Sequence, residues 1–145
     1  MIIANEIIVK LKEEMTERMV IGMGYNTEPK ILYGRYTWSE IKDIPTICFC
    51  DTGIDLNESM GDMGHAWLNI LIYGYADHDG IDRADSIRDL AMDTVYFIYK
   101  DFSFTDDTEV ISNIEILPGG EGKPVGIFTL EIRVMFDYTH STINT

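Results

Sequence analysis

The chain has 145 residues, of which 46% are hydrophobic and 25% charged, and its formal net charge at pH 7 is -14. A chain of this length can bury a sizeable core as one domain spanning residues 1–145. The excess of acidic side chains argues against proteins that grip nucleic-acid phosphates or anionic membranes. No run of about 20 apolar residues is present, so we expect no membrane-spanning segment, and we expect no secretory leader.

The negative charge is concentrated in the middle of the chain. Residues 51–109 carry 14 acidic and three basic side chains, for a net charge of -11. Residues 1–50 have a net charge of -1 and residues 110–145 a net charge of -2. Any electrostatic role of the protein is therefore expected to depend on the middle segment.

The first regular element predicted along the chain is an amphipathic helix over residues 2–19. At about 100° per residue, its apolar side chains fall on one side and most of its charged side chains on the other. The apolar set is Ile3, Ala4, Ile7, Ile8, Leu11, Met15 and Met19. Residues 30–43 follow no clear period, residues 45–51 predict a strand, and the glycine-containing acidic residues 52–64 predict a loop or a loose hairpin.

Three further strands and a second helix are predicted in the rest of the chain. Residues 65–76 are apolar on both faces, which indicates a strand covered on both sides or placed in an interface. Residues 81–100 predict an amphipathic helix, residues 110–117 a strand and residues 118–124 a loop. Residues 125–138 alternate strictly, with a buried face made of Phe128, Leu130, Ile132, Val134, Phe136 and Tyr138.

This order of elements predicts an α+β fold: a mostly antiparallel β-sheet with two amphipathic helices packed on one face. The closing strand, residues 125–138, is much longer than the usual five or six residues. A strand of that length can extend beyond its own sheet to reach a neighbouring molecule.

The densest cluster of polar residues in the sequence offers little chemistry. It consists of His65, Asp77, His78, Asp79 and Asp82. A divalent cation could use such side chains, but the spacing of a calcium loop is not met, and Asp79 or a neighbour is expected to cap the second helix. No activated serine or cysteine nucleophile is evident. We therefore expect no enzyme activity, no metal and no cofactor.

The two cysteines, Cys48 and Cys50, are one residue apart. On a strand their side chains would point the same way and lie too far apart to bond without distortion. A single pair of this kind is also a weak metal signal, so we expect buried free thiols.

A row of carboxylates marks the polar side of the second predicted helix. Asp82, Asp85, Asp89 and Asp93 follow one another at spacings of three, four and four residues. Two interpretations remain open at this point: a solvated helix face, or a surface that must be negative because it lines a channel for a polyanion.

The arrangement as a whole resembles the tail terminator, or tail completion, proteins of tailed bacteriophages. The segments that carry the resemblance are 7–11 (IIVKL), 45–49 (PTICF), 68–75 (LNILIYGY), 88–95 (RDLAMDTV), 114–120 (IEILPGG) and 126–138 (GIFTLEIRVMFDY). These family members are small α+β proteins that form a ring, commonly hexameric, on top of the tail tube and join it to the head connector.

The resemblance implies a structural virion protein of the phage tail or neck, assembled in the host cytoplasm. Its partners would be copies of itself in a ring, the tail tube protein and the head-tail connector protein, and DNA would pass through an acidic channel without specific binding. The candidate interface loops contain Gly53, Asp55, Met60, Gly119, Gly120 and Gly122. The alternatives are another small phage neck or tail-tube component, or a small-ligand or metal-binding α+β domain that uses His65 and His78.

Overall fold

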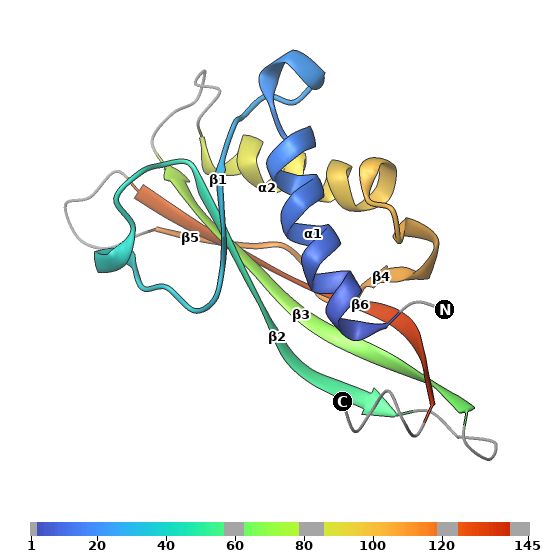
Figure 1. Ribbon diagram of the computed structural model, residues 1–145. Coiled ribbons are helices and arrows are strands. Elements are labelled where there is room, and N and C mark those ends of the chain that lie inside the picture. The colour runs from blue at the N-terminus through green and yellow to red at the C-terminus, as the bar shows by residue number, and fades with distance from the viewer. Residues whose placement is uncertain (1–2, 57–62, 79–85, 119–124, 140–145) are drawn as a thin grey trace.

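A computed structural model describes residues 3–56, 63–78, 86–118 and 125–139 (Figure 1). It places two helices against one face of a six-stranded sheet with the strand order β1-β2-β3-β6-β4, and β5 also pairs with β6. Only β1 and β2 run parallel among the described strands, because every other pairing is antiparallel. The predicted α+β fold is confirmed.

Three long strands make the centre of the sheet: β2 (Thr46–Leu56), β3 (Met63–Asp77) and β6 (Val125–Thr139). The strands β3 and β6 pair along their whole length, from Met63 opposite Thr139 to Asp77 opposite Val125. The strands predicted over residues 65–76 and 125–138 are therefore confirmed, each slightly longer than expected.

Of the two predictions for residues 52–64, the hairpin agrees with the structure, because β2 and β3 pair in antiparallel fashion, and the loop is wrong at both ends. Residues 52–56 continue β2, and residues 63–64 already belong to β3. An irregularity in register between Asp51 and Gly53 lets the strand bend and continue. Because residues 51–56 are exposed, the polar and acidic side chains that suggested a loop are accommodated in a strand.

The remaining strands are short: β1 (Lys30–Tyr33), β4 (Thr108–Val110) and β5 (Glu115–Pro118). The single strand predicted over residues 110–117 is wrong, because β4 and β5 are separate strands that both pair with β6. Between them, the hydroxyl of Ser112 accepts a hydrogen bond of 2.8 Å from the backbone N–H of Glu131. That side chain replaces a backbone partner and interrupts the ladder.

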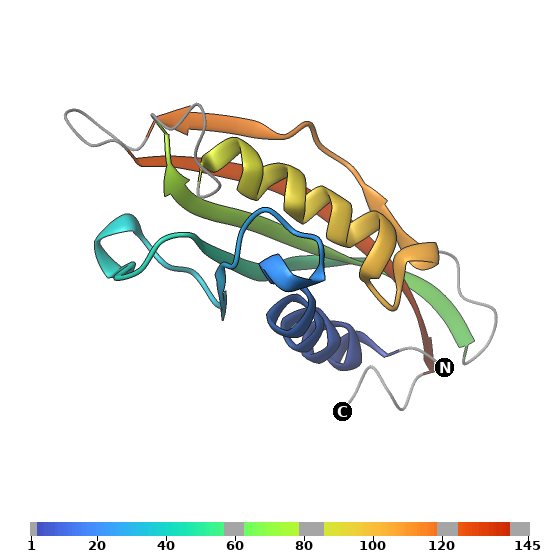
Figure 2. The ribbon, with the colours of Figure 1, turned by 90° about the horizontal axis from the view of Figure 1, so that it is seen from above.

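The helix layer consists of α1 (Ala4–Arg18) and α2 (Ile87–Tyr96), and α2 runs on into a π-helical turn, η3 (Phe97–Asp101). Seen from above, the two helices lie side by side over the sheet (Figure 2). The predicted helix over residues 2–19 is confirmed, whereas only residues 87–100 of the second helix can be compared, since residues 81–85 lie outside the described chain. Ser86 caps α2, because its hydroxyl accepts a hydrogen bond of 3.3 Å from the N–H of Asp89.

The main core lies between the helices and the inner face of the sheet. The inward side chains of β6 predicted from alternation are buried as expected, and they pack with β3, β2 and both helices. The largest fully buried side chains include Phe49, Phe97, Phe128, Ile7, Leu11 and Met15. The two-helix, one-face packing therefore follows the predicted pattern.

The outer face of the sheet is covered over only one half. Residues 34–45, which include the short helix η2 (Trp38–Glu40), fold over Cys48, Tyr73 and Tyr75 to form a second, smaller core. The hydroxyl of Tyr73 accepts a 2.6 Å hydrogen bond from the N–H of Tyr36 and so fixes this cover. Among the described residues the other half of the face has no such cover, and there β3 presents His65, Trp67 and Asn69 outward.

Leu130 tests the assignment of the two faces of β6. Its side chain is fully buried between the sheet and the helices, so Leu130→Asp should lower the free energy of unfolding by about 4 kcal/mol or more. Glu131→Ala, one residue along on the opposite face, should change it by less than ~1 kcal/mol. Thermal melting followed by circular dichroism measures both. A Leu130→Asp protein that melts cooperatively near the wild-type temperature would show that the faces are reversed.

The covered half of the outer face predicts a loss of stability at alkaline pH. Burial raises the pKa of the Cys48 thiol from its ordinary value of 9.0 to about 11. Unfolding releases this proton between those pH values, so the stabilisation is complete below pH 9.0 and decreases as pH rises toward about 11. Burial likewise raises the pKa of Tyr73 to about 12.

Urea unfolding at a series of pH values measures this loss. The slope should approach about 1.4 kcal/mol per pH unit for each proton released. Cys48→Ala should flatten the curve between pH 9 and 10, where Tyr73 contributes little. An unchanged curve in that variant would contradict the assignment to Cys48.

Candidate functional site

The carboxylate row predicted on the second helix does not form a solvated stripe. Asp93 is buried, with 4% of its surface exposed. It accepts hydrogen bonds from the N–H of Asn26 at 3.0 Å, from the N–H of Thr27 at 2.8 Å and from the hydroxyl of Thr27 at 2.5 Å. Asp93 therefore fastens α2 to the segment that follows α1.

Of the other members of the row, the structure describes only Asp89. Asp89 is half-buried and accepts a 3.0 Å hydrogen bond from the hydroxyl of Ser86, as part of the helix cap. Asp82 and Asp85 lie outside the described residues. The proposed channel-lining stripe and the solvated-face interpretation are both wrong for Asp93, because a loop covers it.

A second buried carboxylate was not singled out from the sequence. Glu14 of α1 is 6% exposed and accepts a 2.7 Å hydrogen bond from the N–H of Ser103, whose hydroxyl also donates to it. Its position between Leu11 and Met15 was the available signal, because it falls on the apolar side of the helix. Glu14 joins α1 to the segment that follows η3.

The open half of the outer sheet face carries most of its charge as carboxylates. The side chains there alternate with the buried ones of β3 and β6, and the acidic members among the described residues of this half and its rim are Asp55, Glu109, Glu131 and Asp137. Glu115 also faces outward, but it lies opposite Thr129, at the level of Tyr73 in the covered half. Against the four carboxylates of the open half stand one guanidinium, that of Arg133, and one imidazole, that of His65. The face is therefore negative overall.

Cross-strand contacts hold these side chains in place. The Arg133 guanidinium lies 2.6 Å from the Glu109 carboxylate and stacks 4.1 Å from the centre of the Trp67 ring. His65 lies 2.6 Å from Asp137 through Nδ1 and Oδ1. Glu131 lies in a shallow depression of about 240 Å³ with Asp55. Two of these four carboxylates, Glu109 and Asp137, thus have a basic partner on the face.

The polar cluster considered as a metal site is not assembled. His65 and the pair Asp77 and His78 lie at opposite ends of β3, on the order of 40 Å apart at about 3.3 Å per residue. Asp79 and Asp82 lie outside the described residues. In the part of the chain that the structure describes, no group of three His, Cys, Asp or Glu side chains is placed to hold a metal ion. Cys48 and Cys50 are buried free thiols, as predicted.

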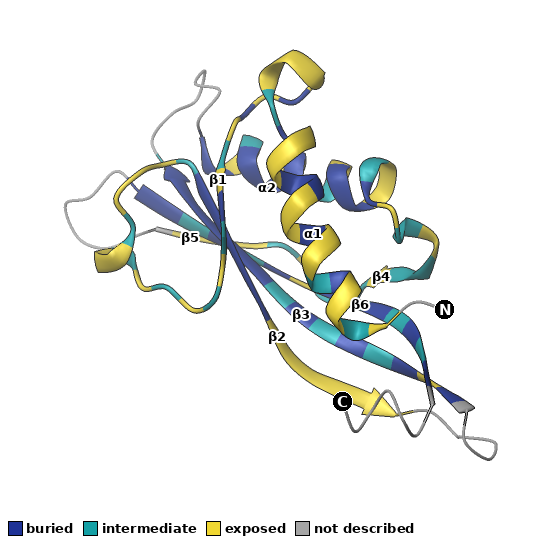
Figure 3. Ribbon diagram, in the orientation of Figure 1, coloured by how far each residue is buried: buried dark blue, intermediate teal, exposed yellow. Residues whose placement is uncertain are grey.

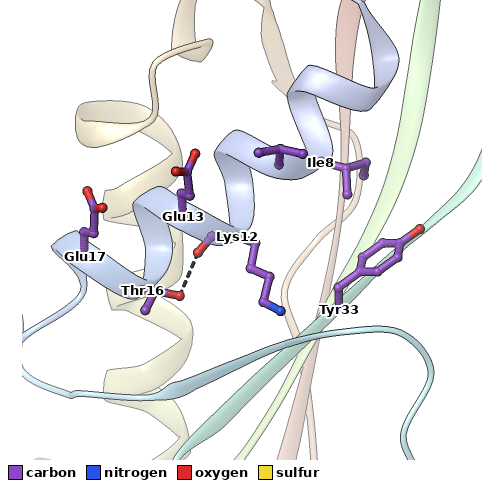
Figure 4. Close-up of a pocket in the computed structure, with 7 residues that line it drawn as sticks. Ile8, Lys12, Glu13, Thr16, Glu17 and Tyr33 are labelled. Carbon is purple, nitrogen blue, oxygen red and sulfur yellow. Dashed lines mark hydrogen bonds between the residues drawn. The ribbon is translucent and has the colours of Figure 1, made fainter.

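The residues assigned to interface loops are divided between a strand and undescribed segments. Gly53 and Asp55 lie in the exposed half of β2, visible as the yellow part of that strand in Figure 3. Met60, Gly119, Gly120 and Gly122 lie outside the described residues. Next to the exposed half of β2, a groove of about 410 Å³ runs between α1 and Tyr33 (Figure 4).

Comparisons with known proteins give no family assignment. No protein-family model matches the chain, and no curated protein matches it in sequence. Among the described residues, no helix is long and apolar enough to cross a membrane.

Asp93 and Asp89 offer a matched test of the hydrogen bonds that join α2 to residues 26–27. Asp93→Ala leaves the N–H groups of Asn26 and Thr27 without their partner, so we expect it to lower the free energy of unfolding by about 3 kcal/mol. Asp89→Asn keeps an acceptor at the helix cap and should cost less than ~1 kcal/mol. Urea unfolding of the two variants measures the difference. Equal, small losses in both would contradict the structural role of Asp93.

Proposed function

We propose that this chain is the tail terminator protein of a tailed bacteriophage: a structural protein that forms a ring, caps the tail tube and joins it to the head connector. DNA would pass through the ring without specific binding. The proposal gives the protein no catalytic step, and its partners are copies of itself, the tail tube protein and the connector.

The observation that carries the proposal is the open, acidic half of the outer sheet face. A rigid wall of carboxylates repels the phosphates of DNA, so a polyanion can slide past without sticking. This face replaces α2 as the candidate channel wall, because Asp93 is buried and Asp89 serves the helix cap. Two carboxylates of this face lie on β6, away from both strand edges: Glu131, which is exposed, and Asp137.

The fold and the lengths of its central strands also support the proposal. The α+β arrangement is the one that the resemblance implies, and β3 and β6 are each 15 residues long. Such strands provide a tall, continuous wall rather than a small patch. A second reading, another small neck or tail-tube component, fits the same wall and is separated from the first by where the protein binds on a tail.

Electron microscopy of the purified protein mixed with tail tubes that lack a terminator tests the location. We expect a ring at one end of each tube and a restored ability of the tails to join heads. Decoration along the tube, or incorporation at many positions, would favour a tube component instead. Absence of any binding to tails or connectors would contradict the proposal.

Charge reversal tests the channel wall. Glu131→Lys with Asp137→Lys changes the charge of the open sheet face by +4, and should make the assembled ring retain double-stranded DNA at low salt and slow DNA ejection. The matched control, Glu13→Lys with Glu17→Lys, makes the same change on the exposed side of α1 and should leave both properties unchanged. Equal behaviour of the two double variants would show that the sheet face does not line the channel.

A further inference from the structure

One half of β2 has no strand partner on its outer side among the residues that the structure describes. The short strand β1 pairs only with residues 46–49 of β2, and the N–H of Gly34 adds one further bond to the carbonyl of Phe49. Beyond that point, residues 50–56 pair with β3 on one side and with no described strand on the other. Their outward N–H and C=O groups can be satisfied in a regular way only by another extended chain.

Apolar side chains accompany this free edge. Ile54 and Leu56 are 52% and 63% exposed. They lie opposite Leu68 and Ala66, which belong to the main core, so both point to the helix side of the sheet. With the described residues alone, this half of β2 is exposed, as its yellow colour in Figure 3 shows.

The opposite edge of the same sheet lies at the same level. Ile54 is opposite Leu68, Leu68 is opposite Val134, and Val134 is opposite Thr108 of β4. The order of antiparallel pairings makes β4 run antiparallel to β2. A second copy set beside the first, with its strands in the same direction, would therefore bring its β4 antiparallel to the free half of β2.

The side chains beside β4 complement those beside β2. On the helix side, Phe104 and Val110 are half-buried against the main core and keep apolar surface at the edge. Ile111, which follows β4, is 46% exposed and lies on the outer side of the edge, where it borders the depression lined by Asp55 and Glu131. On the helix side, Phe104 and Val110 would cover Ile54 and Leu56 of the next copy.

The free half of β2 carries the exposed carboxylates of Asp51 and Asp55, but one lysine stands near this edge. Lys12 of α1 extends toward Tyr33 beside the β2 edge, whereas Glu13 and Glu17 turn away from it (Figure 4). On the other edge, η4 (Thr105–Asp107) directly precedes β4 and presents the exposed carboxylate of Asp106. With only 11 Lys and Arg in the whole chain, a lysine at this edge is a distinctive feature.

We propose that the free half of β2 binds the β4 edge of a second copy of this chain, so that the sheet continues from one molecule to the next. The two edges are unlike, so each copy uses β2 toward one neighbour and β4 toward the other, and such contacts produce a ring when the rotation closes. This interface deepens the proposed function, on which it rests for the ring, and it identifies the surfaces that join the copies.

Two double variants, each with lysines at one edge, test the interface. Ile54→Lys with Leu56→Lys places charges on the β2 edge, and Asp106→Lys with Ile111→Lys places them beside β4. All four side chains are exposed, so folding should be retained, as circular dichroism can verify. The control, Met23→Lys with Met92→Lys, changes two exposed apolar side chains that lie away from both edges.

Sedimentation velocity gives the expected pattern. Wild type and control should assemble, and each edge variant alone should be monomeric. A mixture of the two edge variants should form dimers of one molecule of each, because one intact β2 edge meets one intact β4 edge and nothing can be added further. Assembly of either edge variant like wild type, a mixture that stays monomeric, or a monomeric wild type at its highest soluble concentration would overturn the proposal.

Hydrogen exchange provides a second readout that needs no variant. The amides of residues 50–56 that point away from β3 should become protected as wild type assembles, and exchange at equal rates in monomer and assembly would overturn the proposal. The outcome is separate from that of the tail experiments. Copies joined through these edges that do not cap tails would leave the interface valid and refute the terminator function. Rings that cap tails but still assemble with both edge variants would support the terminator function and refute the interface.

Discussion

The pairing of β3 with β6 is the interaction on which the rest of the structure depends. The two strands are joined from Met63 opposite Thr139 to Asp77 opposite Val125 without a break in register. The second edge of β3 holds β2, the second edge of β6 holds β4 and β5, and the inner face of the pair supports α2. A shift of this pairing by one residue would turn every buried side chain of one strand to the outer face. The core therefore fixes both the register and the position of the two sheet edges.

A strongly acidic chain must hold its helix layer together with few basic partners. It does so by burying carboxylates against N–H and hydroxyl groups: Asp93 accepts from Asn26 and Thr27, and Glu14 accepts from Ser103. A buried charge is costly unless hydrogen bonds replace its water, and backbone N–H groups supply them without a cation. Tyr25 extends the same scheme, since its hydroxyl donates to Asp101 at 2.5 Å, and burial together with that carboxylate raises its pKa.

Periodicity predicted the elements that bury one face and expose the other. The strict alternation over residues 125–138 identified the buried side chains of β6, and the apolar side of residues 2–19 identified those of α1. Periodicity failed where a distant segment decides the environment. A helical wheel placed Asp93 on the polar side of its helix and could not show that residues 26–27 return to cover it. His65 and Asp77 were likewise grouped in one polar cluster of the sequence, but they lie at opposite ends of β3.

The acidic face and the free edges were harder to predict for a related reason. Glycine and acidic residues suggested a loop over residues 52–56, yet an exposed edge strand tolerates the same residues because only its paired side is constrained. Side chains of the open sheet face come from four strands, so no contiguous stretch of sequence is rich in them. The carboxylates of this face become neighbours only through the register of β2, β3, β6 and β4.

The two unlike edges and the net charge act against each other, and this opposition has a consequence for assembly. An unprotected strand edge with exposed apolar side chains invites pairing with any other chain, whereas a charge of -14 on each copy repels other copies. In the proposed ring, both edges of each copy are paired with neighbouring copies, and the acidic face remains open toward the channel. The cost of bringing the like charges together falls as salt screens them, while the hydrogen bonds and apolar contacts of the edges are little affected. Assembly then depends on a match between edges rather than on general attraction, which favours the specific neighbour over other partners.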